Sequence, residues 1–376
     1  MVGMVNPPAG LGYVCGVGSR RITKNKSKQL IHFAFCNAMY GLVVVDGAAF
    51  GSDMSHFFGA KLAGDIICEY YPNYIEHGDY SIVARRMLPW NGYNGQFADN
   101  RYIFIGCNDA TMQEAMKHHP NWDNLKQSVR RLMGRNEAIV KSPDLSTRPR
   151  FISCFTPDGV EKGDQTNWKT GGTGHAIRSG SEIGVRVYNI GNNATNDLIC
   201  NKVLKAHGEL QKKYGVDTFR LVENAIENHM PFNVIHGDIR EHWKDFDIVI
   251  HGCNCQNTFG AGFAQAIKQI APLAFEADQQ TKKGDAKKLK TYTTAMQDGV
   301  RFINAYTQVF WGRDEEVLYS DYDAIARILR RVSKEYPNSR ILMPKIGCGL
   351  ANGCWITVSN IIEAELKNCQ VTIIEK

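Results

Sequence analysis

The stretch from Val234 to Gly262 constrains the fold of this chain more than any other. A short apolar run ends in Gly237-Asp238, and a second run ends in His251-Gly252-Cys253-Asn254. A glycine-rich turn then opens a helix with apolar periodicity. Short apolar runs that end in glycine and polar residues are typical of buried strands in an α/β sheet. Ligands bind at the carboxyl ends of such strands, so these residues predict a ligand site there.

A second glycine-rich loop occurs near the C-terminus. The apolar stretch 340–346 runs into Gly347-Cys348-Gly349-Leu350-Ala351, and a helical pattern follows over 355–367. Glycine-rich turns at helix starts leave backbone N–H groups free to approach phosphates. One such loop is weak evidence for a nucleotide site, whereas two loops behind a Gly-Asp strand end are a specific signal.

The order and spacing of these loops over residues 232–376 resemble the macro domain, an ADP-ribose-binding module. The resemblance implies that Asp238 and the Ile239 backbone hold adenine and that Asn254 meets the distal ribose. The residues that would wrap the diphosphate come from both loops: Gly260, Ala261, Gly262, Phe263, Gly347, Cys348, Gly349, Leu350 and Ala351. Taken alone, Asp238 would be interpreted as a helix N-cap or turn residue, and it is the flanking glycine loops that favour a role in binding.

His251 bears on the subclass of macro domain. The common family pattern is Asn-Ala-Ala-Asn, and this chain has His251-Gly252-Cys253-Asn254 instead. A histidine at the first position resembles the ADP-ribose-1″-phosphate phosphatase branch, which implies catalytic roles for His251 and Asn254. Histidine near a terminal phosphate can act as nucleophile or general acid. The alternative is a buried histidine whose hydrogen bonds are satisfied within the core.

The second loop also resembles the branch that removes ADP-ribose from glutamate side chains. That branch carries an aspartate directly after the leucine of the loop, and here the position is Ala351. Lys290, in the charged run 282–290, is a candidate for the lysine of such a hydrolase. That run otherwise predicts an exposed loop.

The N-terminal half repeats the pattern of strand, glycine loop and helix. Residues 13–19 begin as a short apolar strand that breaks into Gly16-x-Gly18-Ser19-Arg20, and the strand 42–45 leads into a loop that ends in Gly51-Ser52-Asp53. A third loop, Gly171-Gly172-Thr173-Gly174, precedes a helix. Such repeats predict a doubly wound nucleotide-binding fold. Arg21 stands where the dinucleotide fingerprint has its third glycine, which argues against an NAD dehydrogenase.

The three loops resemble the SLOG superfamily, which joins DprA-like DNA-processing proteins, LOG-type nucleotide hydrolases and sensors of nucleotide-derived signals. The residues that would contact its ligand lie in these loops and the helix after them: Gly16, Gly18, Ser19, Arg20, Gly47, Gly51, Ser52, Asp53, Gly171, Gly172, Thr173, Gly174 and Arg178. The LOG branch has a catalytic glutamate where Arg178 and Ser179 stand, so binding is expected rather than hydrolysis. The alternative is that these glycines serve only tight turns.

Together these patterns predict an α/β protein with two three-layer α/β/α domains. We expect a SLOG-like Rossmannoid domain over 1–215, a linker over 216–231 and a macro domain with a mixed sheet over 232–376. Because SLOG relatives often self-associate, the resemblance also implies a homo-oligomer. ADP-ribose or a related small molecule is the expected partner of the second domain, and a second nucleotide-type ligand that of the first.

Charge and cysteine usage limit the classes of function. The net charge of +6 and the pI near 8.6 are compatible with anionic small ligands. They are lower than the strongly basic charge expected of a domain dedicated to binding nucleic acid. The 11 cysteines lie mostly in apolar runs, as reduced thiols of a cytoplasmic protein do. Cys253-x-Cys255 with Cys348 and Cys354 fits no standard zinc spacing. No metal, other cofactor or nucleic-acid partner is therefore expected.

Membrane association is also not expected from the sequence. Spanning a bilayer needs about 18 consecutive apolar residues, and no such run occurs. The N-terminus lacks the basic flank and long apolar core of a secretory signal. These features predict a cytoplasmic location.

Three functional hypotheses follow. The first is a protein that binds ADP-ribose or a derivative and dephosphorylates ADP-ribose-1″-phosphate. The second is a non-catalytic sensor or sponge of ADP-ribose-like or cyclic nucleotide signals, as in phage defence or anti-defence. The third is DprA-like binding of single-stranded DNA by the N-terminal domain, which predicts a steep loss of affinity with salt.

Overall fold

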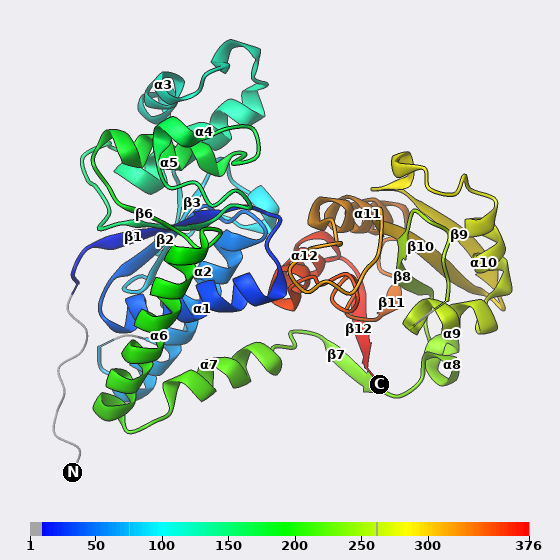
Figure 1. Ribbon diagram of the computed structural model, residues 1–376. Coiled ribbons are helices and arrows are strands. Elements are labelled where there is room, and N and C mark those ends of the chain that lie inside the picture. The colour runs from blue at the N-terminus through cyan, green and yellow to red at the C-terminus, as the bar shows by residue number, and fades with distance from the viewer. Residues whose placement is uncertain (1–9, 75, 261, 376) are drawn as a thin grey trace. The chain divides into compact units, whose positions relative to one another are not determined.

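The computed structural model describes residues 10–74, 76–260 and 262–375 (Figure 1). The chain divides into two compact units, Met1–Asn228 and His229–Lys376. Each unit contains a six-stranded sheet with helices packed on both faces. The predicted fold class, an α/β protein with two three-layer units, is therefore confirmed. Among the described residues, no helix combines the length and the apolar character needed to cross a membrane.

The sheet of the N-terminal unit is entirely parallel, with the strand order β4-β3-β2-β1-β5-β6. Its strands are β1 Tyr13–Gly18, β2 Val43–Asp46, β3 Ala84–Leu88, β4 Ile103–Ile105, β5 Ile152–Phe155 and β6 Val187–Asn189. Because the strands are parallel, their carboxyl ends meet at one edge. The loops after β1, β2 and β5, which carry the predicted ligand residues, leave the sheet from this edge.

Helices cover both faces of this sheet (Figure 1). On one face lie α1 Lys24–Met39, α2 Ser52–Tyr70 and α6 Asn193–Tyr214, with α7 Thr218–Glu227 against them. On the other face lie α4 Gln127–Lys141 and α5 Thr173–Glu182, with α3 Asp109–His118 against both. Short 3₁₀ turns occur at Tyr93–Gly95, Trp122–Asn124 and Gly163–Gln165.

Helix α7 occupies part of the segment that the sequence predicts as linker. Asp217 caps it by accepting a hydrogen bond from Arg220 N (3.0 Å), and Val222 is buried. An N-cap aspartate followed by apolar residues at helical spacing is a recognisable start signal. The boundary between the units falls directly after this helix, at Asn228.

The sheet of the C-terminal unit is mixed, with the strand order β7-β12-β11-β8-β10-β9. Its strands are β7 Asn233–His236, β8 Ile248–Asn254, β9 Tyr292–Gln297, β10 Val300–Gln308, β11 Arg340–Met343 and β12 Gln370–Glu375. Only β9 runs antiparallel to its neighbour among the described strand pairs. The β9–β10 hairpin therefore closes one side of an otherwise parallel sheet.

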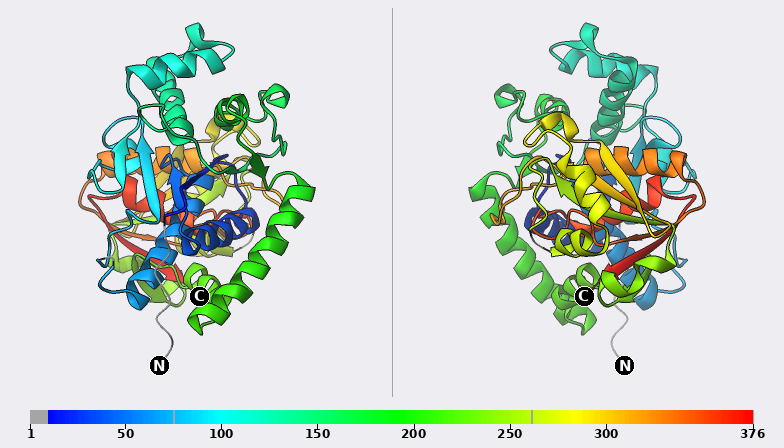
Figure 2. Two further views of the ribbon diagram at one scale, coloured as in Figure 1. Left: turned by 90° about the vertical axis from the view of Figure 1, so that its left-hand side faces the viewer. Right: turned by 90° about the vertical axis from the view of Figure 1, so that its right-hand side faces the viewer.

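Two groups of helices enclose this second sheet, as the views from either side also show (Figure 2). One group is α8 Ile239–His242, α9 Gly262–Ile270 and α10 Pro272–Gln279. The other is α11 Tyr322–Glu335 and α12 Trp355–Glu365. The unit also has 3₁₀ turns at Trp243–Asp245 and Ala286–Lys288. Under the first group, Trp243 packs on Phe302 with ring centroids 5.3 Å apart.

Buried histidines make the stability of this fold depend on pH. Burial lowers the pKa of His56, His207 and His251 to about 4 in each case. The unfolded chain protonates these side chains near their ordinary pKa of about 6.5. Between these values the unfolded state binds more protons at these histidines, so their contribution to stability is full above pH 6.5 and is lost as the pH falls toward 4. Burial raises the pKa of Asp53 to about 7, which acts in the opposite direction, but it is one group against three.

We expect the free energy of unfolding to decrease by a few kcal/mol (order of magnitude) between pH 7 and pH 4.5. Urea titrations at fixed ionic strength, followed by circular dichroism, measure this change. The same titrations between pH 7 and pH 8 should differ little. An unfolding midpoint that stays constant down to pH 4.5 would contradict the assignment of buried neutral histidines.

Candidate functional site

The two predicted loops of the C-terminal unit lie side by side. Strands β8 and β11 are adjacent and parallel, so both loops leave the same edge of the sheet. Gly252, near the end of β8, faces the second loop. A Cβ atom there would lie 3.1 Å from Ile346 Cγ1 and 3.8 Å from Gly347 N. The missing side chain of Gly252 therefore lets the second loop rest on the end of β8.

The second loop is a tight turn held from beneath. Gly347 has a φ of +73°, which favours glycine. Its carbonyl oxygen accepts hydrogen bonds from Ser320 Oγ (2.6 Å) and Gly353 N (2.9 Å). The Ala351 carbonyl accepts bonds from the amides of Tyr319 and Ser320, both at 3.1 Å. Residues 319–320 thus support the whole turn.

The tip of this loop offers free backbone donors. Gly349 and Leu350 are exposed, and their amides donate to no acceptor within the described part of the chain. By contrast, the amide of Cys354, the N-cap of α12, donates to the Tyr322 hydroxyl (2.7 Å). Anion binding at this loop would therefore use the exposed tip and not the N-cap amide of α12.

The first loop is shaped by asparagine side chains. Asn254 Oδ1 accepts a hydrogen bond from Gln256 N (2.9 Å), and Asn254 Nδ2 donates to Thr258 Oγ1 (2.6 Å). Gly260 is exposed, and Gly262, with a φ of +57°, begins α9. Ala261 lies outside the described residues. Asn254 therefore has a structural role in this loop in addition to the predicted contact with ribose.

A buried polar cluster under the first loop was not expected from the sequence. Lys288 Nζ donates to Asn257 Oδ1 (2.7 Å) and Thr281 Oγ1 (2.8 Å), and its side chain is buried. Asp278 is also buried and accepts a bond from the Tyr306 hydroxyl (2.7 Å). The prediction of an exposed loop over 282–290 is therefore wrong for Lys288. The pattern of charges in the sequence did not indicate that Lys288 is buried, because one of its partners, Asn257, lies 31 residues away along the chain.

Asp238 adopts the capping geometry. Its Oδ1 accepts hydrogen bonds from the Arg240 amide and from Arg240 Nε, both at 2.9 Å, and Oδ2 pairs with the same guanidinium at 2.5 Å. Arg240 also donates to Gln269 Oε1 on α9 (3.0 Å). Ile239 is buried. The carboxylate remains partly exposed beside the predicted site, so capping and ligand contact are compatible.

His251 points into the core. Its Nε2 lies 2.7 Å from Asn304 Oδ1 on β10, and its ring contacts Phe259 edge-on at 5.3 Å. Asn304 Nδ2 donates to Ala274 O and Thr293 Oγ1, so Oδ1 is the acceptor and His251 Nε2 carries the proton. Burial lowers the pKa of His251 to about 4. This geometry favours the alternative of a neutral structural histidine over a nucleophile.

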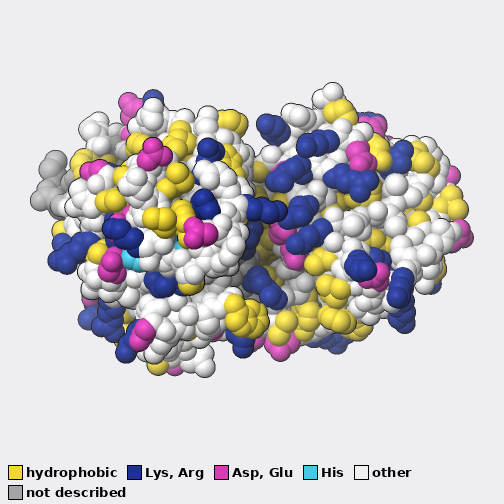
Figure 3. All heavy atoms as spheres, turned by 90° about the horizontal axis from the view of Figure 1, so that it is seen from above, with side chains coloured by type: hydrophobic (Ala, Val, Ile, Leu, Met, Phe, Trp, Pro, Cys, Tyr) yellow, Lys and Arg dark blue, Asp and Glu magenta, His cyan; other side chains and the backbone are white. Residues whose placement is uncertain are grey.

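Of the two residues expected in a hydrolase that removes ADP-ribose from glutamate, the aspartate is missing and the candidate lysine is already paired with a carboxylate. Ala351, at the position of the family aspartate, is buried. Lys290 Nζ forms an ion pair with Asp323 Oδ2 at 2.8 Å. Over the neighbouring α11, Lys and Arg side chains gather on the face that Figure 3 shows. The arginines of α11 have acidic partners: Arg327 with Asp323, Arg330 with Glu365 and Arg331 with Glu335. Asp323 pairs with both Lys290 and Arg327, so the cations in and beside this helix outnumber the carboxylates that pair with them.

In the N-terminal unit, the first and second predicted loops are brought together. Ser52 Oγ donates to the Ser19 carbonyl (2.9 Å), and a Cβ atom on Gly51 would lie 2.8 Å from that oxygen and from Arg20 Cα. Glycines also allow α2 to pack on β1. A Cβ atom on Gly16 would lie 2.6 Å from His56, and one on Gly18 would lie 2.7 Å from Ser52.

The second loop of this unit is already occupied by a carboxylate of the protein. Asp53 Oδ2 accepts hydrogen bonds from the amides of Gly47 (3.1 Å) and Ala49 (3.3 Å) and lies 4.0 Å from Arg135 NH1. Burial raises the pKa of Asp53 to about 7. The amides that sequence patterns assign to a phosphate thus bind Asp53 in this structure.

The third loop of this unit is exposed to solvent at its first two glycines. Gly171, with a φ of +63°, and Gly172 are exposed before α5, whereas Thr173 and Gly174 are buried. Asn136 Nδ2 donates to Gly172 O (3.4 Å), and the adjacent Arg135 donates to Gly47 O. Helix α4 therefore links the second and third loops.

The guanidinium group of Arg178 is already hydrogen-bonded to other parts of the N-terminal unit. Its Nε donates to His118 O (2.7 Å) and its NH1 to Thr166 Oγ1 (2.7 Å), which ties α5 to the end of α3. Near this point, ligand atoms of Glu114, His118 and Glu182 lie close enough together to suit a metal ion. However, Lys141 Nζ lies 2.7 Å from Glu114 and 2.9 Å from Glu182. The ammonium group of Lys141 supplies the cation of this cluster.

Part of the chain is similar to proteins that are already known. No family model matches the chain. An uncharacterized 17.5 kDa protein of the tk-vs intergenic region of Enterobacteria phage T4 is 29% identical over 150 residues, which is 38% of this chain and 94% of the phage protein. A protein of unknown function from Bacteroides thetaiotaomicron, of known structure, is 26% identical with a TM-score of 0.34, covering 40% of this chain and all of that protein.

Two further structures are more distant in sequence. The macrodomain of Thermus aquaticus DarG is 17% identical with a TM-score of 0.30, covering 39% of this chain and 98% of that one. Thermosipho africanus DarTG, solved in complex with ADP-ribose, is 17% identical with a TM-score of 0.29 and covers 45% of this chain and 50% of that one.

Ser320 provides a test of how the second loop is held. Substitution Ser320→Ala removes the hydrogen bond to the Gly347 carbonyl, so we expect a loss of about 1 kcal/mol in the free energy of unfolding. We also expect faster hydrogen exchange over residues 347–353. Ser339→Ala, which removes a bond to Tyr336 O (3.0 Å), is the matched control. Equal exchange of the loop in both variants would contradict this role of Ser320.

Proposed function

We propose that the C-terminal unit is a macro domain that binds ADP-ribose or a derivative of it. The observation that carries the proposal is that β8 and β11 are adjacent and parallel, so the glycine loops that follow them leave the same edge of the sheet; Gly252 of β8 lies against Ile346, just before the second loop, where a Cβ atom would meet Ile346 at 3.1 Å. Two glycine loops on one sheet edge can supply backbone N–H donors to a diphosphate. Proximity of the loops could not be assumed from their separation in sequence.

In this proposal each part of the ligand meets a different element. The exposed amides of Gly349 and Leu350 donate to one side of the diphosphate, and the turn before α9 approaches it from the other. Asp238 accepts the hydrogen bond of the adenine amino group. Its ion pair with Arg240 (2.5 Å) fixes the direction of the carboxylate.

The N-terminal unit has a second proposed site, for a nucleotide-derived ligand, at its third loop. Gly171 and Gly172 are exposed at the start of α5, and the first turn of that helix carries no acidic residue. The second loop supports this site only indirectly, because Asp53 fills its amides. We propose binding rather than hydrolysis there, since Arg178 is held by His118 and Thr166.

Binding of ADP-ribose is tested by calorimetry on the full chain. Asp238→Asn keeps an N-cap oxygen but removes the negative charge, so we expect roughly tenfold weaker binding with little loss of stability. Asp247→Asn is the matched control, because Asp247 pairs with Arg340 (2.9 Å) away from the loops. No heat with wild-type protein, or equal affinity of both variants, would overturn the assignment of Asp238.

Catalysis by His251 is tested separately. Because the ring is buried, neutral and bonded to Asn304, we expect no release of inorganic phosphate from ADP-ribose-1″-phosphate above the rate without protein. We expect His251→Gln to lower the melting temperature instead. Phosphate release that this variant abolishes, while ADP-ribose still binds, would establish the phosphatase hypothesis.

A further inference from the structure

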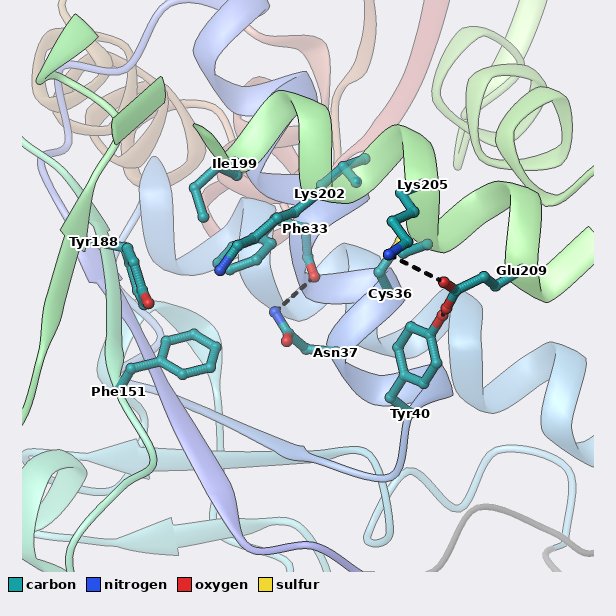
Figure 4. A pocket seen from close by; sticks show the side chains of 12 residues that line it. Phe33, Cys36, Asn37, Tyr40, Phe151, Tyr188, Ile199, Lys202, Lys205 and Glu209 are labelled. Atoms are coloured by element: carbon teal, nitrogen blue, oxygen red, sulfur yellow. Dashed lines mark hydrogen bonds and ion pairs between the residues drawn. The ribbon is translucent and has the colours of Figure 1, made fainter. Parts of the chain in front are cut away.

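The N-terminal unit contains a pocket away from the predicted loops (Figure 4). Its volume is about 330 Å³, near the lower limit of small-molecule sites. It lies between α1, α6 and the strands β5 and β6. Phe151, which precedes β5, and Tyr40, which follows α1, both line it. These positions place the pocket toward the amino ends of the strands, whereas the predicted loops leave the opposite edge.

Aromatic rings form one wall of this pocket. Phe33 stacks on Phe151 with centroids 5.7 Å apart, and Phe151 meets Tyr188 edge-on at 5.3 Å. Ile199 and Val203 of α6 complete the apolar lining. An apolar, aromatic cavity of this size accommodates a small ring system, because planar rings gain from stacking and edge contacts.

The charges around these rings are positive. Lys202 Nζ lies 5.5 Å from the centroid of the Tyr188 ring. The Arg186 guanidinium lies 4.8 Å from the same centroid, but Arg186 lines a different pocket together with Glu161 and Glu182. Within the described residues, no carboxylate lies within ion-pairing distance of either cation. In Figure 4, Lys202 extends from α6 over the aromatic wall. Cations on an aromatic surface without acidic partners favour a ligand that carries negative charge.

The acidic residue that lines the pocket is already engaged. Glu209 accepts a hydrogen bond from the Tyr40 hydroxyl (2.6 Å), and Lys205 Nζ lies 3.9 Å from it. Asn37 Nδ2 donates to the Phe33 carbonyl (2.8 Å). Glu209 thus has partners at the far end of the pocket from Tyr188, and Lys202 is the cation of the pocket lining that lies beside the rings.

We propose that this pocket binds a small aromatic anion, with the rings against Phe33, Phe151 and Tyr188 and the anionic group at Lys202. The class comprises carboxylates, sulfonates or phosphates of one or two fused rings, which the volume of about 330 Å³ accommodates. This site is independent of the proposed ADP-ribose site, because all of its residues belong to the N-terminal unit.

The test compares two fluorescent probes that share a ring system. 8-Anilinonaphthalene-1-sulfonate carries the anion, and N-phenyl-1-naphthylamine lacks it. We expect full-length protein to bind the sulfonate more tightly, and Lys202→Ala to weaken sulfonate binding roughly fivefold without changing binding of the neutral probe. Added salt should weaken only the sulfonate. Lys202→Arg should retain the binding.

Control variants separate the pocket from other surfaces. Lys212→Ala, an exposed position on the same helix, should leave both affinities unchanged. Ala206→Phe should fill the cavity and abolish binding of both probes, with folding checked by circular dichroism. Sulfonate affinity in Lys202→Ala equal to that of wild type would overturn the proposal. Unchanged binding in a folded Ala206→Phe protein would do the same.

Discussion

The C-terminal unit depends on close contact between the backbone of one loop and the end of a neighbouring strand. Gly252 carries no side chain where β8 meets the second loop, and a Cβ atom there would meet Ile346 at 3.1 Å. Ser320 then fixes the loop by donating to Gly347 O. Since protein interiors are close-packed, one added carbon at this point would crowd both Ile346 and Thr307 Oγ1, which lies 3.0 Å away. The shape of the whole candidate site follows from that contact.

In most of the loops that the sequence predicts to bind ligands, side chains of the protein itself form hydrogen bonds with the loop. Asp53 binds the amides of the second N-terminal loop, and Asn254 shapes the first C-terminal loop with its own side chain. Buried donors need partners, and a nearby side chain meets that need at a lower entropic cost than a diffusing ligand. Within the described chain, the exposed amides at Gly349 and Leu350 and those of the third N-terminal loop are available to external anions.

Much of the fold could be predicted from the sequence, because short apolar runs and glycine turns obey local rules. The two α/β units and the mixed second sheet agree with the prediction. Helix α7 was missed, although Asp217 gave a capping signal. The burial of Lys288 and the Asp278–Tyr306 bond had no local signal, because their partners are distant in sequence.

Local patterns in the sequence predicted several strands, the turns that require glycine and their order, but not the strands β3, β4, β9, β10 and β12. The tertiary structure alone decided what the polar side chains do. From the sequence, His251 is a candidate for both catalysis and the core, and the structure places its Nε2 2.7 Å from Asn304 Oδ1 within the core. Arg178 is a candidate for ligand binding, and in the structure it is hydrogen-bonded to His118 and Thr166. Secondary structure is set by neighbours along the chain, whereas hydrogen-bond partners and burial are set by contacts between segments far apart in sequence.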